Sequence, residues 1–128
     1  MLTVGIKGTQ SVEVVNENTA KSIGSGLLPV FATPAMAALM EKTASESVAV
    51  YLGDGEGTVG ISLNIRHLAA TPVGLTVTCE SELIEIDRKR LVFSLKVSDG
   101  HDIIGDGTHE RFIINNDRFM EKAEAKLG

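Results

Sequence analysis

The 128-residue sequence has little of the chemistry that identifies several large classes of protein. Its one cysteine, Cys79, cannot form an internal disulfide, and three histidines are too few for a Cys/His zinc framework. Tryptophan is absent, tyrosine occurs once, and the net charge of −5 opposes the counterion release that gives proteins affinity for nucleic acids. We therefore exclude a disulfide scaffold and structural zinc, and we expect no nucleic-acid partner.

Long apolar runs are also missing. None approaches the ~20 residues that cross a bilayer, and the start of the chain lacks the charged and apolar regions of a secretory signal. We therefore expect a cytoplasmic protein with no membrane partner, in which Cys79 is a reduced, structural side chain. The length fits one domain, residues 1–128, and 43% apolar with 23% charged residues is typical of globular proteins.

The pattern of apolar residues predicts an α+β domain. Residues 2–6 and 11–15 alternate as a short strand or a pair of strands would, and residues 16–26 predict a short helical turn and a flexible loop. A helix is expected over residues 34–52, because Thr33 can cap it, Pro34 suits its first position and Gly53 begins its stop signal. Strands are expected at 59–66, 75–86, 91–98 and 103–114, and a short helix at 117–127.

The arrangement of these elements follows from their order. Short turns between the later strands predict an antiparallel meander. The first two turns of the long helix are apolar on every side, so other structure should surround it. A curved sheet wrapped around this helix satisfies both requirements.

Common enzyme motifs are absent or out of context. Residues 55–60 match G-x-G-x-x-G, but they follow a helix and open a strand, the reverse of the dinucleotide-binding arrangement. The sequence has no P-loop, no G-x-S-x-G elbow and no H-E-x-x-H.

Three polar residues do not fit their apolar surroundings. Glu41 follows the most apolar part of the helix, where a carboxylate is costly unless it is paired. His67 continues the alternation of Val59, Ile61, Leu63 and Ile65, so it should share their inward face. Thr33 starts the helix. Each has a plainer interpretation: a helix cap for Thr33, a core histidine for His67 and a solvent-facing carboxylate for Glu41. One buried network would explain all three.

The segments that carry these residues are VFAT at 30–33, AALME at 37–41, RHLAATPVGLTVT at 66–78 and IGDGTHER at 104–111. Together they resemble the fluoroacetyl-CoA thioesterase family of the hotdog-fold thioesterases, and the spacings of eight residues from Thr33 to Glu41 and 26 from Glu41 to His67 match as well. The resemblance implies that Thr33, Glu41 and His67 are catalytic. It also implies that Gly60 and Arg111 line the active site.

The resemblance further implies a fold, partners and a reaction. The fold is a hotdog domain that forms a homodimer or a dimer of dimers, with active sites at the subunit interface. Glu41 would either deprotonate the attacking water or attack the thioester itself, and Thr33 would position its carboxylate. His67 would donate to the departing thiolate, and the Gly60 N–H would donate to the carbonyl oxygen. No cofactor is expected beyond the coenzyme A of the substrate.

The substrate is expected to be a short or medium acyl-CoA other than fluoroacetyl-CoA. Where the family's fluoroacetyl-CoA enzyme has phenylalanines that form an apolar lid, this chain has the small, flexible segment 24–28. The phosphates of CoA need cations, and those available are Lys42, Arg66, Arg88, Lys89 and Arg90. The basic hairpin tip at 88–90 has a plainer interpretation as a solvated turn.

Two other functions remain open. A hotdog domain can serve as a non-catalytic acyl-CoA-binding module, since a fold does not determine a function. It can also serve as an enoyl-CoA hydratase or dehydratase, although the spacing of Thr33, Glu41 and His67 argues against this. His101 lies beside the Asp99-Gly100 turn and is expected to be solvated, and His109, near Arg111, receives no role.

Overall fold

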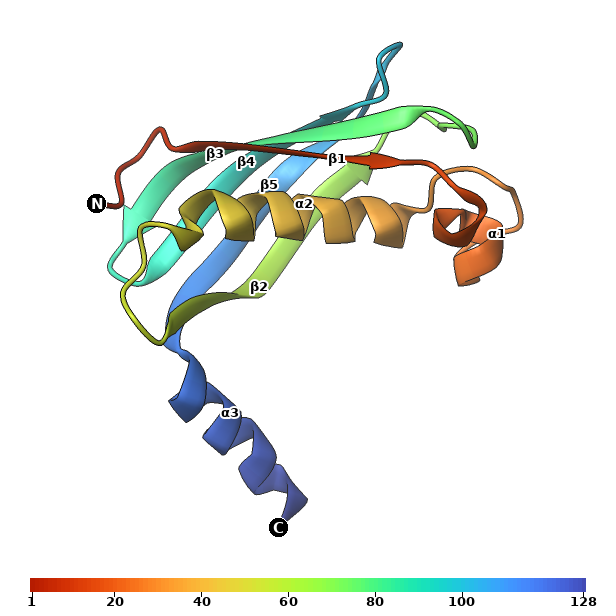
Figure 1. The fold of residues 1–128 in the computed structure, drawn as a ribbon. Helices are drawn as coiled ribbons and strands as arrows, with labels where there is room; N and C mark the ends of the chain where they lie inside the picture. Colours follow the sequence, from red (N-terminus) through yellow and green to blue (C-terminus); the bar gives the residue numbers. More distant parts are fainter.

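One long helix lies against the concave face of a five-stranded sheet in the computed structural model, which describes all 128 residues (Figure 1). The elements in chain order are β1 (Lys7–Glu13), η1 (Asn16–Asn18), α1 (Ala20–Ile23), α2 (Thr33–Ala49), β2 (Glu56–His67), β3 (Thr76–Asp87), β4 (Arg90–Ser98), β5 (Ile103–Asn115), α3 (Asn116–Glu124) and η2 (Ala125–Leu127). No helix is both long and apolar enough to cross a bilayer.

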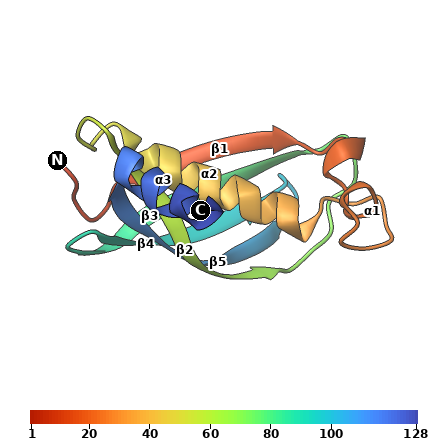
Figure 2. The same ribbon diagram turned by 90° about the horizontal axis from the view of Figure 1, so that it is seen from below.

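The sheet is entirely antiparallel, in the order β1-β3-β4-β5-β2. Figure 2 shows it curling around α2, as the sequence predicts. The meander is confirmed only for β3, β4 and β5. Strand β2 instead pairs with β5 and forms one edge of the sheet, while β1 forms the other. Both edge strands therefore have one side without a partner in the single chain.

Two apolar clusters hold α2 on the sheet. Met36, Leu39 and Met40 join one cluster, and Ala44 and Val48 join the other. These positions recur every three or four residues, so they lie along one face of the helix. Each buried Met, Leu or Val contributes roughly 1.5–3 kcal/mol. The opposite face is less covered than expected: Pro34 and Ala38 are exposed, so the sheet of one chain does not surround the helix.

The ends of several elements differ from the prediction. A single strand, β1, replaces the two N-terminal segments. Helix α2 ends at Ala49, and its last turn tightens, with the N–H groups of Tyr51 and Leu52 donating to carbonyls three residues earlier. The N-cap is Ala32, so the Thr33 side chain does not cap the helix. Pro34 does lie in the first turn.

Helix α3 projects from the end of the sheet (Figure 1). Asn115 caps it by accepting a hydrogen bond from the Arg118 N–H, at 3.0 Å. None of its residues is buried, and Phe119 and Met120 are exposed. The helix therefore takes no part in the core of this chain.

Candidate functional site

Thr33 and His67 meet where α2 begins and β2 ends. The Thr33 Oγ1 atom lies 2.7 Å from Nδ1 of His67. Because Ala32 provides the N-cap, the Thr33 hydroxyl is free to make this contact. Both side chains line a pocket of about 350 Å³, together with Phe31, Leu68 and Ala69 among others. The structure therefore brings together two of the three residues of the expected network.

The imidazole of His67 is held by one nitrogen only. Burial is the main cause that lowers its pKa, and the nearby backbone of Ala69 acts in the opposite direction. Its Nε2 atom is buried and has no hydrogen-bond partner. A buried polar group without a partner costs about 1–3 kcal/mol. Unpaired buried polar atoms of this kind are rare in native proteins and call for an explanation.

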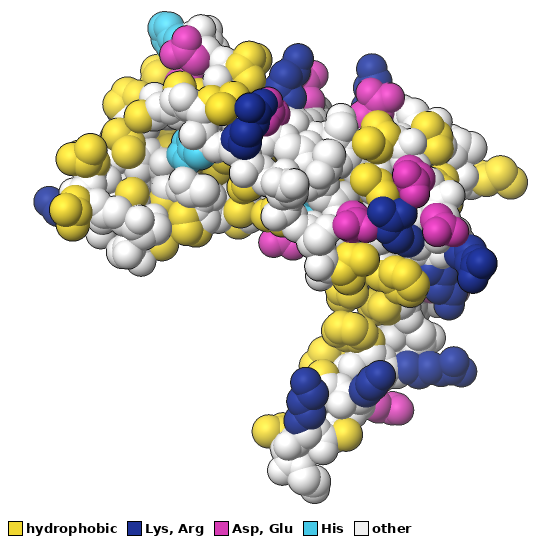
Figure 3. Space-filling model, turned by 180° about the vertical axis from the view of Figure 1, so that it is seen from behind, with side chains coloured by type: hydrophobic (Ala, Val, Ile, Leu, Met, Phe, Trp, Pro, Cys, Tyr) yellow, Lys and Arg dark blue, Asp and Glu magenta, His cyan; other side chains and the backbone are white.

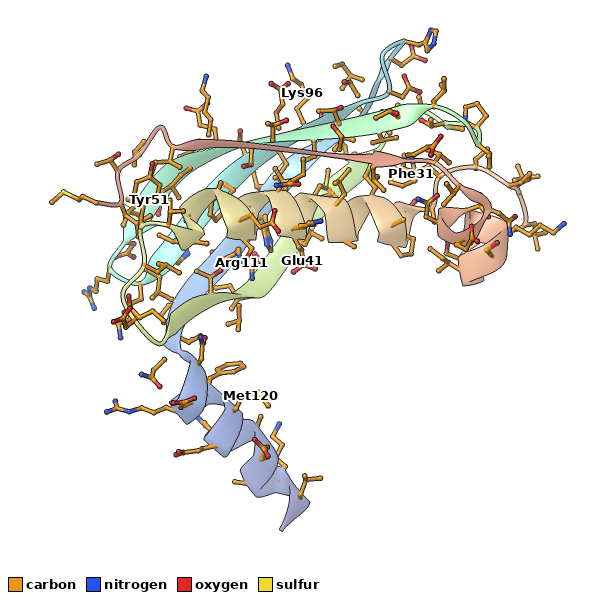
Figure 4. All side chains as sticks on the ribbon, viewed as in Figure 1. Phe31, Glu41, Tyr51, Lys96, Arg111 and Met120 are labelled. Carbon is orange, nitrogen blue, oxygen red and sulfur yellow. The ribbon has the colours of Figure 1, made fainter.

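Glu41 lies on α2 about two turns after Thr33, and its side chain faces β2 and β5. Its Oε2 atom is 3.5 Å from Nη1 of Arg111 and 3.9 Å from Nε2 of His109. Figure 4 shows the labelled Glu41 and Arg111 next to each other between α2 and the sheet. The Glu41 side chain is 47% exposed, so it is not buried in the core. Its carboxylate also has a cation nearby, the guanidinium of Arg111.

Gly60 makes this arrangement possible. A Cβ atom at this position would lie 2.6 Å from Oε2 of Glu41, 3.1 Å from Cε1 of His109 and 3.4 Å from Nη1 of Arg111. Only a residue without a side chain leaves the carboxylate where it is. Gly60 and Arg111 therefore lie beside Glu41.

Arg111 is a buried cation that several acceptors hold in place. Its Nε donates to Oγ1 of Thr58 and its Nη2 to the carbonyl oxygen of Thr58, both at 2.8 Å. Its Nη1 lies 3.1 Å from Nε2 of His109. Burial lowers the pKa of the guanidinium, but Glu41 opposes this and arginine stays charged.

A β-bulge in β2 corrects the predicted inward face of that strand. The pairing with β5 shifts between Gly60 and Ser62, so Ile61 has no partner residue and is 53% exposed. Beyond the bulge, Leu63, Ile65 and His67 alternate inward as predicted. Before it, Gly60 takes the inward position expected for Ile61. The inserted residue reverses the alternation.

The expected single network of Thr33, Glu41 and His67 does not form within one chain. Thr33 contacts His67, whereas Glu41 contacts Arg111 and His109. Eight residues along an α-helix correspond to a rise of about 12 Å, and no hydrogen bond links the two groups. The separation is fixed because both Thr33 and Glu41 belong to the same straight helix.

Sequence reasoning did not find the roles of His109 and Thr58 in this cluster. The available signal was alternation, because His109 lies two residues before Arg111 and so shares its face of β5. Among the cations considered for CoA, Arg66 is paired with Asp106, and Arg90 with Glu85 and Glu110. The other candidates, Lys42, Arg88 and Lys89, form no ion pair.

A sheet curved around one long helix, with a threonine–histidine pair and a glutamate on its concave side, defines a hotdog-fold protein of the thioesterase type. Residues 14–117 match the family described as "FlK: Fluoroacetyl-CoA-specific thioesterase", and the chain belongs to that family. A fluoroacetyl-CoA thioesterase of Streptantibioticus cattleyicolor is 44% identical over 97 residues, which cover 76% of this chain and 70% of the relative.

Solved structures show the same fold. A mutant of the fluoroacetyl-CoA-specific thioesterase FlK, in complex with fluoroacetate and CoA, is 37% identical with a TM-score of 0.87, and the match covers 92% of this chain and 99% of that one. A hot-dog-like protein from Thermanaerovibrio acidaminovorans is 25% identical with a TM-score of 0.89, covering 98% and 93%. The predicted hotdog fold and family are confirmed.

Proposed function

We propose that the chain is an acyl-CoA thioesterase in which Thr33, Glu41 and His67 are the catalytic residues. The observation that carries this proposal is the half-exposed Glu41 carboxylate, held beside the buried Arg111 over a glycine. A carboxylate so placed can remove a proton from water or attack a thioester carbonyl. Membership of a thioesterase family supports the same reaction.

His67 is suited to the leaving thiolate. If the Thr33 hydroxyl donates to Nδ1, the proton of the neutral imidazole lies on Nε2, the nitrogen that has no partner in the protein. In the reaction the carbon–sulfur bond breaks, the acyl carbon gains oxygen from water, and the Nε2–H of His67 donates a hydrogen bond to the departing thiolate. The proton released by water passes to Glu41, either directly or when water cleaves a Glu41 anhydride, and from there to the thiolate, so that His67 stays neutral. No cofactor is required beyond the CoA of the substrate.

Glu41→Gln tests the assignment. This substitution keeps the size of the side chain but removes its basicity and nucleophilicity. Release of free thiol from a panel of acyl-CoAs should fall at least ~100-fold, with unchanged thermal unfolding. Wild-type chain that binds acyl-CoA without releasing thiol would support the binding module instead. Loss of enoyl absorbance without thiol release would support the hydratase.

The substrate class follows from the loop over the pocket. Ala20, Ser25 and Val30 line the same 350 Å³ pocket as Thr33 and His67, and they are small or medium side chains. Leu27 and Leu28, 90% and 65% exposed, lie outside it. We therefore assign a short or medium acyl-CoA, not limited to fluoroacetyl-CoA.

A homodimer, alone or paired into a dimer of dimers, would complete the site. The edge strand β2 has a free side, and Pro34 and Ala38 on the outer face of α2 are exposed. A second copy on this face would bring the Thr33–His67 pair of one chain toward Glu41 of the other. The proposed location is the cytoplasm, with no nucleic-acid or membrane partner.

Complementation tests the shared site. Thr33→Ala and Glu41→Gln chains, each inactive alone, should regain up to about a quarter of wild-type activity when they are mixed and refolded together, since half the dimers would be mixed and each would hold one intact site. Mixing without recovery, in dimers shown by light scattering to exchange, would mean that each site belongs to one chain.

The head group of CoA has a candidate location at the base of α3. Phe112 and Phe119 line a hollow of about 320 Å³ with Lys89, Arg118 and Lys122, and none of these cations forms an ion pair. Figure 3 shows hydrophobic and basic side chains gathered where α3 leaves the sheet. Aromatic rings can stack on the adenine of CoA, and unpaired cations can bind the phosphates of CoA. We therefore assign the nucleotide end of CoA to this hollow.

A further inference from the structure

His109 is a buried histidine whose two ring nitrogens have partners of opposite kind. It is 1% exposed, at the centre of β5. Its Nδ1 lies 2.7 Å from the carbonyl oxygen of Ser62, which can only accept a hydrogen bond. Its Nε2 lies 3.1 Å from Nη1 of Arg111, which can only donate one. The ring is therefore neutral, with its proton on Nδ1 and a lone pair on Nε2.

The bulge in β2 places this carbonyl. Because Ile61 is inserted, Leu63 and not Ser62 lies opposite His109 in the ladder. The Ser62 carbonyl oxygen then accepts from the His109 ring. The bulge in β2 thus determines which tautomer His109 adopts on the neighbouring strand β5.

His109 in turn holds Nη1, the third nitrogen of the Arg111 guanidinium. Thr58 accepts from Nε and Nη2, and both bonds lie on the side of β2. Only His109 and Glu41 lie near Nη1, at 3.1 and 3.5 Å. Without the acceptor on His109, nothing but the half-exposed carboxylate would hold this nitrogen.

We propose that His109 is a positioning residue: its neutral imidazole accepts a hydrogen bond from Arg111 and so holds the guanidinium against the Glu41 carboxylate during thioester cleavage. The activity part of this inference rests on the proposed function. The geometric part, a bare Nε2 that faces Arg111, does not.

Acid should disrupt this arrangement. A proton on Nε2 would turn the acceptor into a donor and place two positive groups 3.1 Å apart. Arg111 and Glu110 flank the ring on its own strand, Glu41 faces it from α2, and β4 contributes the uncharged Phe93. Burial is the main cause that lowers the pKa of His109 and delays this protonation, and Arg111 adds to it.

Two variants separate positioning from a structural role. His109→Gln can still accept from Arg111 with its amide oxygen and donate to the Ser62 carbonyl with its amide nitrogen, whereas His109→Leu can do neither. The matched control is His101→Gln, on the exposed hairpin turn. For each, we would measure kcat and KM with one acyl-CoA from pH 5 to 9, and thermal unfolding.

The expected result is a kcat about 100-fold lower for His109→Leu, since a displacement near 1 Å has an effect of this size, with KM changed less than about threefold. His109→Gln should retain most of the activity and extend it to lower pH than wild type. Equal losses in both variants, or a folded His109→Leu with normal kcat, would overturn the proposal. If His109→Leu does not fold, the pH profile of His109→Gln decides: the same loss of activity at low pH as in wild type would overturn the proposal.

A measurement without substrate keeps this inference separate from the proposed function. Nitrogen-15 NMR of the histidine rings should show His109 with a protonated Nδ1 and a bare Nε2 near neutral pH. A protonated Nε2 would overturn the inference even in an active thioesterase. The expected tautomer in a chain that releases no thiol would instead reject the proposed function alone.

Discussion

Gly60→Ala is the substitution for which the structure sets the sharpest expectation. The new Cβ would lie 2.6 Å from Oε2 of Glu41, whereas ordinary contacts begin at 3.4 Å. The carboxylate must therefore move by about 0.8 Å. A misplacement of this size near the reacting atoms can reduce the rate about 100-fold, or about 2.7 kcal/mol of transition-state stabilisation.

The same substitution should have little effect on stability. Glu41 is 47% exposed, and its carboxylate is the end of a flexible side chain, so it can move into solvent. Gly60 has no left-handed backbone conformation that alanine would strain. Thermal unfolding should therefore stay close to wild type while kcat/KM, measured by release of free thiol from acyl-CoA, falls.

Gly57→Ala is the matched control. It lies on the same strand, and its Cβ would approach a side-chain oxygen at 2.5 Å, but that oxygen belongs to Asn116 at the start of α3. A comparable clash is thus created away from Glu41. Normal activity in Gly60→Ala, or an equal loss in both variants, would refute the reasoning that the glycine exists to accommodate the carboxylate.

Three further predictions follow from the same geometry. Glu41→Gln should lose at least ~100-fold in thiol release without a change in unfolding temperature; near-normal turnover would remove Glu41 from the chemistry. Reversing the charges of Lys89 and Lys122 should raise KM for an acyl-CoA up to about thirtyfold, because two exposed contacts contribute up to about 1 kcal/mol each, but should leave KM for the matching acyl-pantetheine unchanged; equal effects on both substrates would contradict the nucleotide site. Burial lowers the pKa of His67 and His109, so the unfolded state takes up protons first as the pH falls through the ordinary histidine value. Thermal stability should therefore decline from pH 7 to 5, and less steeply in His109→Gln; a flat profile would show that the folded state does not keep these rings neutral.

Local pattern in the sequence was enough to place the secondary structure but not to pair the strands. Alternation predicted β3, β4 and β5 nearly to the residue, because each has one face on the core. The pairing of β2 with β5 joins residues up to 59 positions apart, Glu56 with Asn115, and no local period reports such a pairing. The apolar helix and the short turns predicted a sheet wrapped around the helix, but not the order of its strands.

The site shows where alternation fails. Val59, Ile61 and Leu63 have an unbroken period of two in the sequence. The bulge at Ile61 nevertheless reverses which side chains of the strand face the core before and after it. Nothing in the apolar pattern marks the inserted residue. The role of His109 was missed for a related reason: one of its partners is the backbone carbonyl of Ser62, and a backbone group has no sequence signature.

The burial of Arg111 is the feature that stability alone explains least. Removing a guanidinium from water is costly, and a half-exposed carboxylate at 3.5 Å returns little of that cost. The neutral acceptors Thr58 and His109 satisfy its hydrogen bonds but do not balance its charge. The chain therefore keeps a buried positive charge that only the half-exposed Glu41 carboxylate opposes, beside Gly60, where we propose that an oxyanion develops as a thioester is cleaved. A charge that is expensive in the resting protein and favourable only when negative charge appears is what preorganised electrostatic catalysis requires.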